Sequence, residues 1–417
     1  MFEKIAVLRH MGNDGLDAMA RPHLYVLGRR CSAFRVCGIS GLALAVGLGV
    51  LLTLHLDLSL WMLGVAVCIA VATFLALAMI TKIIVGEERL IYYHHEVAIL
   101  AMVALVLGLL GEPVLSYMDV TILGVGTFLF CGRIGCLMVG CCHGRPHRWG
   151  VCYRTEHAEA GFTPYFVGVR LFPIQLVESA WVFATVAFGV GMVFVGAAPG
   201  AALAWYVIVY DVGRFSFEFV RGDPFRPYRG GFSEGQWTSL LLILAVLGAE
   251  LGGAIPLHVW HVAAGAGVIL AMIGVAAHRR RRRDARHRLL SPGHVHEVAE
   301  AVALLTNLAF APGSAPGPLD IRHHVNVART SLGIRLSTGR VAAGEGDVRH
   351  FTLSSRDGTL EKADAHALFN LVVQLQRRHG RTEIHAAQAG AFHLLVYPPA
   401  ARHNPPYAPT PSEPATP

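Results

Sequence analysis

Long runs of apolar residues dominate the first two thirds of the sequence. A run of about 18 apolar residues is long enough to cross the hydrocarbon core of a bilayer as a helix. The candidate runs fall at 37–55, 58–80, 96–111, 119–140, 174–196, 201–219, 237–251 and 257–277. The pattern predicts eight transmembrane helices, or seven if the last two pack irregularly.

The pattern changes after a basic run, RRRRR, at 279–283. Helical periodicity is visible in 295–310 and 359–380, and strand-like alternation in 324–339, 348–355 and 392–398. About a hundred residues suffice for a small core. We therefore predict an all-α polytopic membrane bundle with a small C-terminal α+β soluble domain. The expected divisions are an interfacial segment (1–36), a transmembrane domain (37–278), a basic linker (279–293), a soluble domain (294–400) and a disordered Pro-rich tail (401–417).

Composition supports the membrane assignment. The chain of 417 residues is 54% hydrophobic and only 15% charged, and its mean hydropathy is +0.49. These values are too apolar for an ordinary soluble protein. The sequence pI of about 9.1 fits attraction to anionic lipid headgroups, so we expect the membrane, and no nucleic acid, as a partner.

Positive charge is confined to one set of the predicted connections. The opposite set, around 56, 112–118, 197–200 and 252–256, contains no Lys or Arg. The positive-inside rule places the basic set, with both termini, in the cytoplasm. With eight spans, the basic connections and the soluble domain share one side of the membrane.

Three charged residues fall near the end of the sixth predicted span. Arg214, Glu218 and Arg221 are spaced i, i+4 and i+7, which predicts one shared helix face. Glu218 can neutralise one arginine, leaving net positive charge directed inward. A structural ion pair with an interfacial snorkelling arginine is the alternative.

Arg133, on the fourth span, is expected at the same membrane depth as Arg214. Gly135, Gly140 and Gly144 follow it, and glycine lets the backbone turn and approach a ligand closely. Guanidinium groups bind phosphate in a bidentate manner. Two arginines from different helices therefore suggest a clamp for a lipid phosphate, while a helix-end anchor is the simpler alternative.

Polar residues also open the third and fifth spans. His94 or His95 can accept a proton from a nucleophile, although a histidine in an amphipathic belt is common. Gln175 and Glu178 stand one turn apart and could order the same site. Their alternative role is helix capping in a solvated first turn.

A group of cysteines and histidines surrounds the end of the fourth span. It comprises Cys131, Cys136, Cys141, Cys142, Cys152, His143 and His147. No C-x-x-C pair is present, so the metal signal is weak. We expect reduced cysteines that pack as small hydrophobic residues, with no metal and no other cofactor; a metal centre or a disulfide is the alternative.

Five ordered motifs resemble those of the prolipoprotein diacylglyceryl transferase family. They are PHLYVLG (22–28), GRIG followed by GxxxGRP (132–146), PIQLVES (173–179), RFSFEFVRGDP (214–224) and SEGQWTS (233–239). The family's GRIGNFxNGE reads GRIGCLMVGC here, so Cys136, Val139 and Cys141 replace two amides and a carboxylate.

The resemblance implies transfer of a diacylglyceryl group from phosphatidylglycerol, or a related anionic lipid, to the cysteine thiol of a lipobox-containing preprotein. It implies a multi-pass protein of the bacterial inner membrane. By motif position, Arg133 and Arg214 bind the phosphate, Glu218 holds Arg214, and His95 or His94 is the essential histidine. The remaining substrate-side candidates are Arg221, Gly140, Gly144, Gln175, Glu178 and Cys136.

Two other classes of function stay open at this point. One is a non-catalytic or sensory membrane scaffold that only binds anionic lipid. The other is a membrane protein that uses its cysteines for metal or redox chemistry.

Overall fold

A computed structural model describes most of the chain. The described residues are 2–86, 92–224, 227–282, 285–309, 326–343, 346–356, 360–376, 381–387 and 390–397. The chain forms two compact units, Met1–Gly293 and His294–Pro417. The tail at 401–417, predicted to be disordered, lies outside the described residues.

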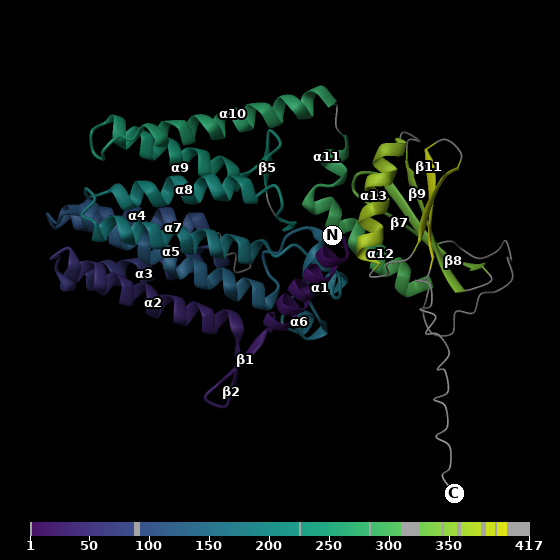
Figure 1. Cartoon of the computed structure of the whole chain (residues 1–417), viewed down its shortest axis with the longest axis horizontal. Helices are drawn as coiled ribbons and strands as arrows, with labels where there is room; N and C mark the ends of the chain where they lie inside the picture. Colours follow the sequence, from purple (N-terminus) through teal and green to yellow (C-terminus); the bar gives the residue numbers. More distant parts are fainter. Residues whose placement is uncertain are drawn as a thin grey trace, which may run out of the picture. The chain divides into compact units, whose positions relative to one another are not determined.

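Long helices running side by side build the first unit (Figure 1). They are α2 (Ala33–His55), α3 (Leu60–Val85), α4 (Tyr92–Leu109), α5 (Val114–Val139), α7 (Ile174–Phe194), α8 (Ala201–Phe217), α9 (Glu234–Leu251) and α10 (Val259–Arg282). Each matches one predicted span. Among the described residues, six of them, all but α8 and α9, are long and apolar enough to cross a membrane. The predicted polytopic bundle is confirmed.

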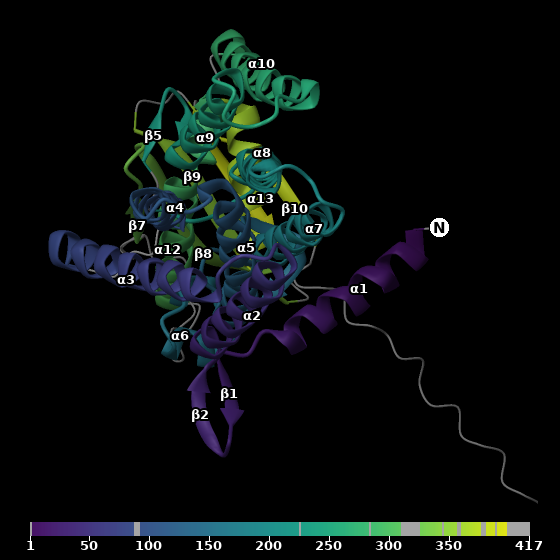
Figure 2. The same cartoon turned by 90° about the vertical axis from the view of Figure 1, so that its left-hand side faces the viewer.

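Helix α5 lies in the middle of the bundle when the unit is viewed end-on (Figure 2). It packs against α2, α4, α7 and α8. Its residues Ile122 and Leu123 are fully buried together with Val182 of α7 and Tyr206 of α8. A helix surrounded on most sides by others is where polar side chains can be brought together away from lipid.

The two ends of the bundle differ in their connections. Short loops at 56–59, 110–113, 195–200 and 252–258 join helices at one end, and they contain no Lys or Arg. At this end Asp119 of α5 caps α8. Its Oδ2 accepts from the Gly200 amide and its Oδ1 from the Leu203 amide, both at 2.7 Å. The cap fixes where α8 begins.

The opposite end carries the long connections. Between α5 and α7 lie β3 (Pro146–Cys152), α6 (Thr155–Glu159), the 3-10 turn Pro164–Phe166 and β4 (Arg170–Leu171). Strands β5 (Tyr228–Arg229) and β6 (Phe232–Ser233) pair between α8 and α9. These segments cover the end of the bundle where α5 and α8 finish and α7 begins.

The N-terminal segment packs on this covered end. Helix α1 (Phe2–Met19) lies against β3, where Asn13 Oδ1 accepts from the Gly150 amide at 3.0 Å. Asp17 also pairs with Arg170 at 2.9 Å. A hairpin of β1 (His23–Val26) and β2 (Arg29–Ser32) then projects from the bundle (Figures 1 and 2).

Several helix boundaries differ from the sequence prediction, by up to five residues. Helix α2 begins at Ala33, four residues before the predicted span. Helix α10 runs on to Arg282, into the segment 279–293 that was assigned to a basic linker, and α11 (Ala285–Leu289) follows within that segment. Arginine is a good helix former, so a basic run at the end of an apolar helix extends it.

The second unit is built on a five-stranded antiparallel sheet of order β10-β11-β9-β8-β7. Its elements are α12 (Pro292–Ala309), β7 (Val327–Arg329), β8 (Ile334–Ala343), β9 (Gly346–Ser355), α13 (Lys362–Leu375), β10 (Thr382–Ala386) and β11 (Ala391–Val396). Alternate residues of β11 are buried, and α13 lies against this strand. The predicted α+β domain is confirmed, although the sequence analysis missed β10.

Candidate functional site

A buried carboxylate, Glu178 on α7, gathers three guanidinium groups at the covered end of the bundle. Its Oε1 is 3.0 Å from Arg133 Nη2 of α5 and 3.0 Å from Arg214 Nη1 of α8. Its Oε2 is 3.1 Å from Arg221 Nη1. Glu178 is completely buried, so the solvated first turn considered for it is wrong.

Two further carboxylates complete this cluster. Glu218 Oε1 lies 3.0 Å from Arg214 Nη2, and Glu218 Oε2 accepts from Ser233 Oγ at 2.9 Å. Asp223 Oδ2 pairs with Arg221 Nε at 2.9 Å. We call Arg133, Glu178, Arg214, Glu218, Arg221 and Asp223 the arginine cluster. The contact between Glu218 and Arg214 fits the positioning role expected of Glu218.

The structure corrects the prediction of one shared helix face for Arg221. Helix α8 ends at Phe217, and Glu218 is its C-terminal cap. Arg221 therefore lies in the following turn, where its backbone forms a β-bridge with Gly144. A tertiary contact between two connections, rather than helical spacing, brings this third guanidinium to Glu178.

The cluster contains three guanidinium and three carboxylate groups, so it has no net charge when all six are ionised. The sequence predicted a net positive charge from Arg214, Glu218 and Arg221. Glu178 and Asp223 cancel that charge. One donor is nevertheless left over. Among the described residues, the buried Arg133 Nε has no hydrogen-bond partner. A buried donor without a partner is costly to the fold and favourable for binding an anionic ligand.

Tyr210 of α8 is a member of the site that the sequence analysis did not identify. It is buried and donates its hydroxyl hydrogen to Glu178 Oε1 at 3.1 Å. Because it precedes Arg214 by four residues on α8, it lies on the same helix face. That spacing was the signal that could have identified it.

The two candidate histidines face different surroundings in the first turn of α4. His95 is 4% exposed, and its ring lies 4.7 Å from that of Phe74 on α3. His94 is half exposed, and its Nε2 lies 3.2 Å from Glu234 of α9. Only His95 is buried.

Glu96, next along α4, is also buried and was given no role by the sequence analysis. It interacts electrostatically with Asp211 and Arg214 of α8. Its carboxylate also interacts with the Tyr92 hydroxyl of the same helix. Helix α4 thus brings a further carboxylate toward the side of α8 that carries Arg214.

Gln175 and the glycines shape the chain that leaves α5. Gln175 Nε2 donates to the Cys141 carbonyl at 2.8 Å, and its side chain is buried. Gly140 has φ +88°, which ends α5 in a left-handed turn, and a Cβ there would lie 2.7 Å from Phe162. A Cβ on Gly144 would lie 2.6 Å from the Phe172 carbonyl oxygen. These two glycines therefore allow close contact with other parts of the protein, whereas the sequence suggested close contact with a ligand.

Three of the cysteines converge beside the arginine cluster. The sulfur atoms of Cys136, Cys141 and Cys142 all lie within 4.8 Å of one another. Hydrogen bonds from Cys136 and Cys141, and then the guanidinium groups of Arg221 and Arg133, hold the pKa of the Cys142 thiol well below its usual value. We call these three residues the thiol cluster. Cys141 is exposed, so it does not pack as the small buried hydrophobic residue that we expected.

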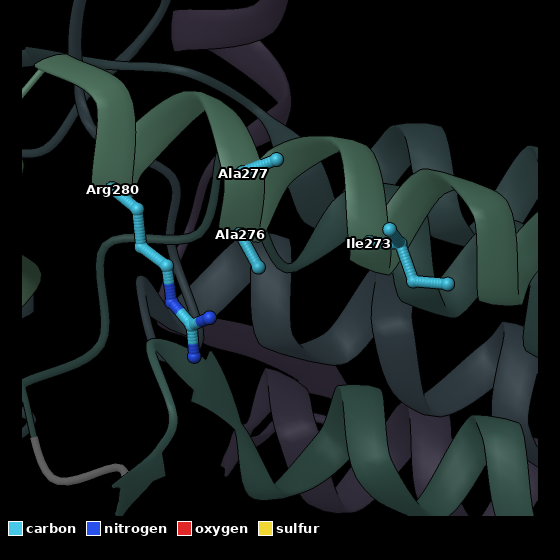
Figure 3. A pocket seen from close by; sticks show the side chains of 4 residues that line it. All are labelled: Ile273, Ala276, Ala277 and Arg280. Atoms are coloured by element: carbon cyan, nitrogen blue, oxygen red, sulfur yellow. The ribbon is translucent and has the colours of Figure 1, made fainter.

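A separate hollow lies along α10 (Figure 3). All its lining residues, Ile273, Ala276, Ala277 and Arg280, come from that helix. None belongs to the arginine cluster or the thiol cluster. With a single guanidinium and three apolar side chains, the hollow lacks the combination of groups that catalysis needs.

Comparison with known proteins identifies relatives of this part of the chain. The family model described as prolipoprotein diacylglyceryl transferase matches residues 94–252. The chain is 31% identical over 136 residues to phosphatidylglycerol–prolipoprotein diacylglyceryl transferase 2 of Clostridium perfringens, which covers 31% of this chain and 49% of the relative. It is 33% identical over 133 residues to the phosphatidylglycerol–prolipoprotein diacylglyceryl transferase of Clostridium tetani, covering 31% of this chain and 51% of the relative. The chain thus spans about half the length of the curated relatives it matches. No solved structure matches it.

Proposed function

We propose that the chain transfers a diacylglyceryl group from phosphatidylglycerol to the cysteine thiol of a lipobox-containing prolipoprotein, because residues 94–252 match the prolipoprotein diacylglyceryl transferase family model and are similar to two transferases of that kind. The matched segment contains α4 to α9 with their long connections, and therefore the whole arginine cluster. A multi-pass bundle gives such an enzyme direct access to a lipid substrate. We place it in the bacterial inner membrane.

The observation that carries this proposal is the convergence of three buried guanidinium groups on Glu178, with Arg133 Nε left without a partner in the part of the chain that the structure describes. The reaction forms a bond between the thiolate sulfur and a glyceryl carbon. The bond between that carbon and the phosphate oxygen breaks, and glycerol phosphate leaves. Arg133 and Arg214 stabilise the charge that develops on the departing phosphate.

The attacking thiol must lose its proton, since the thiolate is the nucleophile. His95 is the histidine we assign to this step, because it is buried near the start of α4 while His94 is half exposed and faces Glu234. Glu218 positions Arg214, and Glu178 positions all three arginines. Gln175, Gly140 and Gly144 hold the turn after α5, and Arg221 and Cys136 line the substrate side.

The test is transfer of label from phosphatidylglycerol, labelled in its diacylglyceryl part, to a lipobox peptide by the purified full chain in nanodiscs. Arg133→Lys and Arg214→Lys keep the charge but lose the planar fork of donors. We expect each to lower the transfer rate by about 100-fold, the usual loss for one transition-state donor. The control is Arg148→Lys, because Arg148 is exposed on β3, and it should transfer label at the wild-type rate.

The same assay tests the lipid-binding scaffold as an alternative. A scaffold would retain labelled lipid, and the arginine variants would weaken that retention, but no label would reach the peptide. Absence of label on the peptide for the wild-type chain, with the lipid bound, would overturn the transferase proposal.

A further inference from the structure

The thiol cluster has the dimensions of a metal site. Three thiolates that bind one zinc ion at about 2.3 Å are roughly 3.8–4.0 Å apart, and the sulfur atoms of Cys136, Cys141 and Cys142 lie within 4.8 Å of one another without an ion. Among the described residues, no other set of three or more histidine, cysteine or acidic side chains converges in this way.

The backbone around the cluster is arranged to direct these sulfur atoms together. Helix α5 carries Cys136 and ends at Val139, and Gly140 then turns the chain back with φ +88°. Cys142 has φ +52°, a conformation that non-glycine residues rarely adopt. The hydrogen bond from Gln175 to the Cys141 carbonyl holds this turn. Strain at a cysteine that faces two other cysteines is more readily explained by ligand binding than by packing.

The surroundings suit an anionic metal–thiolate group. Arg221 and Arg133 both interact electrostatically with Cys142. Three thiolates and one divalent ion carry a single negative charge, which nearby guanidinium groups stabilise. Cys141 is exposed while Cys136 is buried. An ion can therefore reach the cluster from outside, and a site with three ligands leaves a coordination position open.

The geometry points to a site in which the thiolates of Cys136, Cys141 and Cys142 bind one thiophilic divalent ion of the zinc class, with the fourth position open to the acceptor thiol. The second half of this inference rests on the proposed function. Coordination makes the acceptor thiol more acidic, its proton passes to the base assigned above, His95, and the bound sulfur reacts as a thiolate with the glyceryl carbon. The ion keeps its oxidation state, and no oxidant or reductant is consumed.

Metal content of the purified full chain tests the site without reference to transfer. After loading with Zn(II) and dialysis, we expect about one ion per chain, and an affinity at least about tenfold weaker for Cys141→Ser and Cys142→Ser. Cys68→Ser is the control, because Cys68 is exposed on α3. It should bind zinc as the wild-type chain does. Cys136 is buried, so Cys136→Ser is measured together with its thermal unfolding, and a folded variant should bind zinc more weakly in the same way.

The absorption spectrum of bound cobalt(II) reports whether a ligand occupies the open position. We expect the chain loaded with Co(II) to show thiolate-to-metal charge-transfer absorption that increases when a lipobox peptide is added, and does not change with a Cys→Ser peptide.

Binding of less than about one tenth of a zinc ion per chain, or unchanged zinc affinity in Cys142→Ser, would overturn the metal site. No spectral response to the thiol peptide would overturn the open position. Transfer that proceeds fully in metal-free protein would overturn the activation of the acceptor thiol by the ion and leave the proposed function standing.

Discussion

At the scale of single residues, the site depends on Glu178. It is the one carboxylate in the arginine cluster that contacts all three guanidinium groups, and these come from α5, α8 and the turn after α8. Bringing three buried cations together without it would leave their repulsion uncompensated. Glu178 therefore acts through the arginines, by fixing where their remaining donors point.

Replacing Glu178 by glutamine should destabilise the protein strongly. The amide keeps the shape but removes the charge, and breaking a buried ion pair costs about 3–5 kcal/mol. The measurement is the midpoint of thermal unfolding of the purified chain in detergent. The control is Glu234→Gln, since Glu234 is 38% exposed and pairs with His94, a contact worth under about 1 kcal/mol. Equal losses in the two variants would contradict the central place of Glu178.

At the scale of elements, the sequence predicted the helices better than it predicted their ends. Runs of apolar residues identify the eight long helices, α2 to α5 and α7 to α10, because each of them meets lipid or other helices along its length. Arg221 was placed on α8 because its spacing continues the helical pattern. The helix stops at Phe217, however, and Gly222 and Pro224 soon follow, residues that favour a turn.

The pattern of apolar and polar residues could not predict contacts between segments that are distant in the sequence. Glu178 stands in the first turn of an apolar run, where solvent is the ordinary neighbour, but the long connection from 140 to 173 covers that end of the bundle. The spacing of Cys136, Cys141 and Cys142 does not resemble a metal motif, and only the left-handed turn at Gly140 and Cys142 brings their sulfur atoms together. Strand β10 was missed because it is a mostly exposed edge strand with little alternation.

The bridge between Gly144 and Arg221 gives a prediction about two glycines. A Cβ on Gly144 would lie 2.6 Å from the Phe172 carbonyl oxygen, whereas a Cβ on Gly132 would meet nothing within 4 Å. Gly144→Ala should destabilise the chain by about 1–3 kcal/mol through overpacking and weaken transfer by displacing Arg221. Gly132→Ala, inside α5, should be neutral or stabilise by about 0.5–1 kcal/mol. Thermal unfolding of the two variants measures the difference. Equal loss of stability in both would show that the close contact at Gly144 is not the cause.

At the scale of the whole molecule, the first unit has two unlike ends. All the short connections, at 56–59, 110–113, 195–200 and 252–258, lie at one end and contain no Lys or Arg. The arginine cluster lies at the other end, where α5 and α8 finish and α10 ends at Arg282. Helix α8, at 17 residues, is roughly 26 Å long, slightly less than the 30 Å or so of a bilayer core. A short α8 keeps Arg214 within the bundle and near the interface at the same time.

Eight crossings have a consequence that reporter fusions can test. If all eight helices cross the membrane, a reporter fused after Ala160 and one fused after Leu290 will report the same compartment. A fusion after Ala198 will report the opposite one. The positive-inside rule expects the shared side to be the cytoplasm, so alkaline phosphatase should be active only after Ala198, and a fluorescent protein only after Ala160 and Leu290. Opposite compartments for Ala160 and Leu290 would mean seven crossings. Phosphatase activity at both would place the arginine cluster on the outer side and show that its arginines, held by carboxylates, do not govern insertion.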